Sequence, residues 1–92
     1  MAYRVEEHPS FLSALQGAPD ELLILLVDVV YPLLATDPTG ERGGPFGISY
    51  DQAAGFFTLT LYGDQGGSGF LRYQVLEDER LVMLFDLAWL SG

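Results

Sequence analysis

Hydrophobic and polar residues alternate in the second half of the chain. The alternation occurs in two segments, 55–63 and 70–77, and a third segment, 81–90, is apolar on both faces except for Asp86. A period of two is typical of a strand with one buried face. The glycine-rich residues 63–69 and the acidic residues 77–80 separate these segments and are typical of turns. The pattern therefore predicts three antiparallel strands in a meander, preceded by a weak strand or turn at 48–52.

The first half of the chain changes from alternation to helical spacing. Residues 2–7 alternate and predict a short strand, and residues 10–17 carry apolar side chains at helical spacing. Residues 18–38 are long enough and apolar enough for a buried helix, although their periodicity alone also allows a buried strand. Pro32 should kink this helix, and Pro38 should end it.

These elements predict an α+β fold. Their order is β-α-α-β-β-β, which we expect to form an antiparallel sheet with a helical hairpin packed on one face. The sequence shows neither an internal repeat nor a linker, so we expect residues 1–92 to form a single domain.

The net charge of the chain limits the classes of function that it can have. The chain has four Lys+Arg, all of them arginine, against thirteen Asp+Glu, and its net charge is −9. This balance argues against direct nucleic-acid binding, because affinity for a phosphate backbone comes from cations. The N-terminus has no apolar core of the kind a signal peptide needs, and the apolar stretch 22–34 is too short to span a bilayer. We therefore expect a cytoplasmic protein without a membrane segment.

Few residues are candidates for chemistry. There is no cysteine, the single histidine (His8) has only two neighbouring acids, and the glycine loops do not end in Gly-Lys-Ser/Thr. We expect His8 to start a helix, and we expect neither a metal nor a cofactor. Arg72 lies within a predicted strand, where either a functional role or an ion pair with Asp86 or a nearby glutamate is possible. Arg42 is a further cation, in the loop before the sheet.

The last predicted strand indicates a binding surface. Strict alternation places Val82, Leu84, Ala88 and Leu90 on one face and Trp89 on the other. One helical hairpin covers only one face of a sheet, and a large exposed apolar face usually marks an interface. We therefore expect these residues to form a partner interface. The alternative is that loop 39–52 folds back over this face.

The order of elements resembles the RelE/ParE superfamily of toxins from bacterial type II toxin–antitoxin modules. The similarity is carried by "YRVEEHPSFLSAL", "LLATDP", the glycine-rich loop and "FLRYQVLEDERLVMLFDL", and it extends over nearly the whole chain. It implies a compact α+β fold and an antitoxin that wraps the toxin. In the RelE branch it also implies mRNA cleavage on the ribosome by lysines, arginines and a C-terminal tyrosine or histidine.

Only part of that implied site is present. Arg72 matches the arginine of the family's "R-Y" strand and Arg42 is the only cation of the loop, whereas the lysines have no counterpart. RNA cleavage needs several positioned groups, which this chain lacks in sequence. The resemblance therefore favours a toxin-like component that acts mainly through protein binding over an enzyme, and it leaves a ribosome-dependent mRNA endoribonuclease as an open alternative. The alternative is a non-toxic acidic binding module or a homodimer that keeps only the fold.

Overall fold

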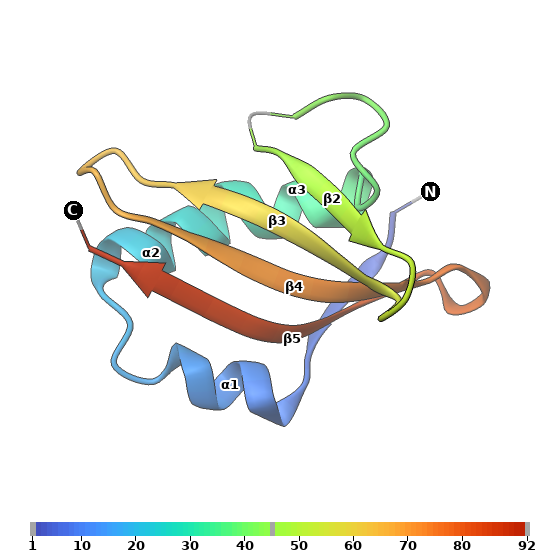
Figure 1. Cartoon of the computed structure of the whole chain (residues 1–92), viewed down its shortest axis with the longest axis horizontal. Helices are drawn as coiled ribbons and strands as arrows, with labels where there is room; N and C mark the ends of the chain where they lie inside the picture. Colours follow the sequence, from blue (N-terminus) through green and yellow to red (C-terminus); the bar gives the residue numbers. More distant parts are fainter. Residues whose placement is uncertain (1, 45, 92) are drawn as a thin grey trace.

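The computed structural model describes residues 2–44 and 46–91, and it has an α+β fold with helices on one side of a single sheet (Figure 1). The predicted fold class is confirmed. The elements in chain order are β1 (Arg4–Glu7), α1 (Pro9–Leu15), α2 (Asp20–Leu25), η1 (Leu26–Val30), α3 (Tyr31–Thr36), β2 (Ile48–Asp51), β3 (Phe56–Tyr62), β4 (Ser68–Leu76), η2 (Glu77–Glu79) and β5 (Leu81–Leu90).

The sheet is mixed, not purely antiparallel as the sequence predicted. Its strand order is β1-β5-β4-β3-β2, and β1 runs parallel to β5. Two parallel neighbouring strands need a long crossover connection. Here the whole chain between β1 and β5, from α1 to η2, forms that connection. The weak segment at 48–52 is a genuine strand, because β2 pairs with β3 from Ile48 opposite Leu59 to Asp51 opposite Phe56.

A β-bulge interrupts β5. Arg72 lies opposite Asp86, but the next residue, Tyr73, lies opposite Leu84, so Phe85 is the extra residue on β5. An extra residue reverses which side chains point to each face beyond it. Val82, Leu84, Leu87 and Trp89 therefore all lie on the helix side, whereas Ala88 and Leu90 lie on the opposite side. Strict alternation along 81–90, as we predicted it, is wrong for this reason.

The second helical segment is continuous but irregular. It begins as α2, passes through one π-helical turn in η1, and ends as α3. The Tyr31 N–H donates to the Leu26 carbonyl, five residues back. Proline has no N–H and disturbs a regular α-helix, and a π turn directly before Pro32 accommodates it. The disturbance predicted at Pro32 is therefore a π-helical turn.

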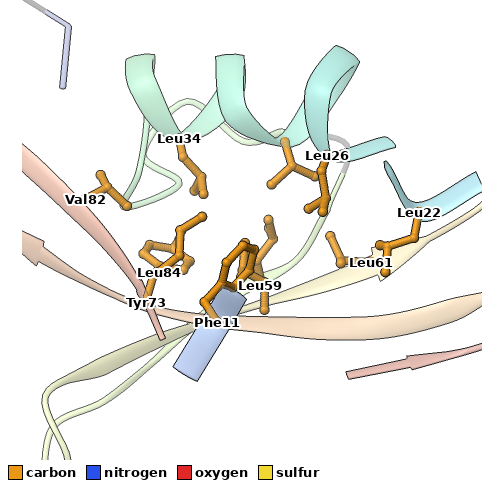
Figure 2. Close-up of a cluster of buried hydrophobic side chains, with 11 residues drawn as sticks. Phe11, Leu22, Leu26, Leu34, Leu59, Leu61, Tyr73, Val82 and Leu84 are labelled. Carbon is orange, nitrogen blue, oxygen red and sulfur yellow. The ribbon is translucent and has the colours of Figure 1, made fainter. Parts of the chain in front are cut away.

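Both helical segments pack against the same face of the sheet. The fully buried side chains come from α1, from the α2–α3 segment and from strands β3, β4 and β5 (Figure 2). Phe11, Leu22, Leu26, Val30 and Leu34 meet Leu59, Leu61, Leu71, Tyr73, Val82 and Leu84. This is the helical layer that the sequence predicted, and it leaves the opposite face of the sheet without a helix (Figure 1).

A buried carboxylate holds the loop that follows α3. Asp37 has a non-helical backbone, and its side-chain oxygens accept the N–H groups of Glu41 and Arg42, each at 3.0 Å. The Tyr73 hydroxyl donates to the Pro38 carbonyl at 2.6 Å from beneath the loop. The loop is thereby fixed to the helix side of the sheet. It does not fold back over the opposite face, which was the alternative that the sequence left open.

Candidate functional site

The uncovered side of strands β3 to β5 is the candidate site, and we call it the open face. Its members share the side of the sheet opposite the helices, and they include Phe56, Thr58, Thr60, Phe70, Arg72, Gln74, Met83, Phe85, Asp86, Ala88 and Leu90. Each of them is half-buried or exposed. Phe70 and Leu90 are the most exposed large apolar residues among them, at 40% and 76%.

Arg72 lies near the middle of the open face. Its guanidinium lies 3.7 Å from the Asp86 carboxylate on β5 and 4.8 Å from the ring centroid of Phe56 on β3. The cross-strand pair with Asp86, one of the two roles proposed from sequence, is present. Exposed pairs of this kind contribute about 0.2–1 kcal/mol to the free energy of unfolding. Arg72 is therefore neutralised by one neighbour and packed against another.

His8 joins the same cluster. Its ring stacks on Phe85 with centroids 4.7 Å apart, and Phe85 meets Phe56 edge-on at 5.2 Å. His8 Nδ1 accepts the Ser10 N–H at 3.1 Å, so His8 caps α1. The expectation that His8 starts a helix is confirmed, and the histidine side chain itself is the cap. Ser10 donates its hydroxyl to the Phe85 carbonyl at 2.7 Å.

The structure does not bring the two candidate arginines together. Arg42 belongs to the loop that is fixed to the helix side, whereas Arg72 projects from the open face. Two other arginines are engaged elsewhere in the described residues, Arg4 with Glu6 at 3.2 Å and Arg80 with Glu77 at 3.9 Å. General acid–base catalysis on RNA needs at least two positioned groups. The described geometry thus gives Arg72 an aromatic and acidic surrounding but no second cation.

The expected interface residues divide between the two faces. Val82 and Leu84 are fully buried in the core and cannot contact a partner in this fold. Trp89 is half-buried on the helix side, where its ring packs against the backbone of Gly63 and Gly67. Ala88 and Leu90 do lie on the open face. The expected shared face of Val82 and Leu84 with Ala88 and Leu90 therefore needs correction, and the bulge at Phe85 is the physical reason.

Sequence reasoning missed Phe56, Phe70 and Phe85 as members of the site. Phe56 and Phe70 stand on the polar side of their alternating segments, which was a usable signal. Phe85 carried no such signal, because its direction depends on the bulge.

Two tyrosines with raised pKa, the buried Tyr73 and the half-buried Tyr31, lie apart from the open face. Burial raises the pKa of Tyr73, and the nearby Asp37 carboxylate raises it further. Burial also raises the pKa of Tyr31, whose hydroxyl donates to Glu7 Oε2 at 2.9 Å. Both hydroxyls stay protonated at neutral pH and act as structural hydrogen-bond donors.

The described residues contain neither a cluster of metal-binding side chains nor a membrane-spanning helix. Across residues 2–44 and 46–91, His, Asp and Glu side chains do not gather in groups of three or more that suit a metal ion. Within the same residues, every helix is too short or too polar to cross a membrane.

The open face differs from the rest of the chain in charge. On strands β3 to β5 it carries one cation, Arg72, and one anion, Asp86, whereas the whole chain has a net charge of −9. Depletion of charge at the centre of a surface is characteristic of protein–protein interfaces. Comparisons with protein-family models, with curated proteins and with solved structures found no match for this chain.

Proposed function

We propose that the protein acts by binding another protein through the open face, as the toxin-like component of a bacterial type II toxin–antitoxin module in the cytoplasm. The observation that carries the proposal is the open face itself. It is a sheet face without a helix, rich in phenylalanine and nearly neutral in a strongly acidic chain. The partner we commit to is an antitoxin-like protein that covers Phe70 and Leu90.

The geometry supports binding over catalysis. Arg72 is the residue that best matches the RelE/ParE strand, and its contacts with Asp86 and Phe56 are those of an interface residue. Arginine stacked on aromatic rings is enriched at the centres of protein interfaces. A toxin that sequesters its target by contact requires such a surface and no catalytic set.

Expression in bacteria tests this proposal. Expression of the chain alone should slow growth, and co-expression of the small protein encoded by the adjacent reading frame should restore growth and yield a stable complex. The Phe70→Glu variant should lose the complex, because it buries a charge at the centre of the contact. Leu12→Glu is the matched control, since Leu12 is 49% exposed on α1 and lies away from the open face.

Unimpaired growth together with the lack of a co-purifying partner would overturn the proposal. Equal loss of the complex in both variants would also overturn it, because the open face would then not be the site.

Self-association is the second candidate function. The near neutrality of the open face favours it, because two copies would meet without strong like-charge repulsion there. Light scattering over a range of concentrations separates the two candidates. A dimer that Phe70→Glu dissociates supports a homodimer, and a monomer at every concentration excludes it.

A further inference from the structure

A groove lies where the helical layer approaches the end of β3. One wall is the exposed side of α2 and η1, and the other wall is the end of β3 with the β3–β4 turn. The hollow has a volume of about 480 Å³. Its lining includes Ile24, Asp28, Phe46, Tyr62 and Asp64.

The apolar residues of the groove are exposed to an unusual degree. Ile24 is 59% exposed, and Tyr62 across the groove is 61% exposed. Leu25 and Val29, one helical turn apart, also line the groove, and Val29 is 37% exposed. Apolar side chains at this spacing on a helix normally face a core or a partner.

The charges of the groove are all negative. Glu21, Asp28 and Asp64 contribute carboxylates, and its lining contains no arginine or histidine. Glu21 is used internally, because its Oε2 accepts the Gln65 N–H at 2.6 Å. Asp28 and Asp64 have no ion-pair partner within the described residues, where the ion-paired arginines meet Glu6, Glu77 and Asp86.

The walls are held in place without a ligand. The Glu21 bond ties α2 to the β3–β4 turn, and a Cβ atom added at Gly63 would lie only 2.5 Å from the Glu21 carboxylate. The Trp89 ring packs against the backbone of Gly63 and Gly67 from beneath. The groove is therefore preorganised, which lowers the cost of binding.

We infer that this groove binds a basic amphipathic segment of a partner protein, with leucine-like side chains on Ile24 and Tyr62 and lysine or arginine beside Asp28 and Asp64. Charge complementarity identifies the occupant, because an exposed apolar groove bordered only by carboxylates repels acidic and favours basic segments. This site is separate from the open face and goes beyond the function proposed above.

A designed peptide tests the site directly. The probe is a helix-forming peptide of roughly two heptads of Leu and Lys, and the comparison peptide has Glu in place of every Lys. Trp89, the only tryptophan, lies against the β3–β4 turn and reports binding by fluorescence. The basic peptide should bind and should weaken with added salt, and the acidic peptide should not.

Matched variants separate the groove from general electrostatic attraction. Asp28→Asn with Asp64→Asn should weaken binding roughly three- to tenfold, as expected for two exposed charge contacts. Asp78→Asn with Glu79→Asn, in η2, gives the same change of net charge and should have little effect. Ile24→Gln should weaken binding, whereas Leu12→Gln on α1 should not.

The inference is overturned if both charge-removing pairs weaken binding equally, or if the acidic peptide binds as well as the basic one. Phe70→Glu on the open face should leave peptide binding unchanged. Loss of the groove and loss of the open-face complex are thereby distinguishable.

Discussion

The two faces of the sheet are built from similar residues but have different surroundings. The helix-covered face contributes Leu59, Leu71 and Leu84, which are fully buried. The open face contributes Phe56, Phe85 and Arg72, which pack mainly against one another. The comparison teaches that apolar side chains alone do not define a core. A core also requires a second layer that covers these side chains, and in this fold the helices cover only one face of the sheet.

We expect the largest difference in stability between the two faces when a buried leucine is replaced. Leu84→Ala should lower the free energy of unfolding by about 2–5 kcal/mol, because it leaves a cavity in the core. Leu90→Ala, on the open face at 76% exposure, should change it by less than about 0.5 kcal/mol. Urea denaturation of both variants measures the difference. Similar losses would show that the open face is as tightly packed as the core.

Two aspartates, one buried and one exposed, allow the same comparison to be made for polar side chains. Asp37 and Asp51 each accept two backbone N–H groups, but Asp37 is 7% exposed and Asp51 lies at the surface. Asp37→Ala should cost about 1–3 kcal/mol, because it removes two hydrogen bonds that are partly shielded from water and fix the loop to the helix side. Asp51→Ala should cost less, because water reaches its donors. Thermal denaturation of the two variants tests this order, and a larger loss for Asp51→Ala would contradict it.

Alkaline pH should weaken the covered face. The pKa of Tyr73 is raised in the folded state, so its contribution is complete below the unfolded pKa near 10.0 and is lost as pH rises beyond it. The unfolded chain releases this proton first, which lowers stability by at most about 1.4 kcal/mol per pH unit. Denaturation at pH 8 and pH 11 measures the loss.

Tyr73→Phe provides the control for the pH experiment. It removes the bond to the Pro38 carbonyl and should cost about 0.5–1.5 kcal/mol at neutral pH. It should also make the alkaline loss shallower. If the alkaline loss is as steep as in the unmodified protein, Tyr73 is not its source.

The smallest effect belongs to the ion pair of the open face. A double-mutant cycle on Arg72→Ala and Asp86→Ala should give a coupling energy of about 0.2–1 kcal/mol, because both side chains are partly exposed. A coupling well above that range would mean that the pair is structural, and Arg72 would then be a poor candidate for partner binding.

The sequence was sufficient for the fold class and most element positions, because alternation and helix signals are local. It missed the parallel pairing of β1 with β5, since the partner of an edge strand is not encoded in either strand's own pattern. It also missed the bulge at Phe85, and that one residue separates Val82 and Leu84, on the covered side, from Ala88 and Leu90, on the open face. The Arg72–Asp86 pair itself depends on the bulge, because a regular ladder counted from the Leu76–Leu81 pair at the turn would place Arg72 opposite Phe85.

The parallel pairing of β1 with β5 has a consequence for synthesis on the ribosome. Residues 4–7 emerge early, but their partners, residues 81–84, are made only after every other strand. The strand that links β1 to the rest of the sheet is thus the last to be made, and its contacts with β1 span nearly the whole sequence. Contacts of such long range slow folding and leave strand edges unpaired in the meantime. We therefore expect the sheet to be completed only after residues 81–84 have left the ribosome, with β1 as the segment most dependent on that step.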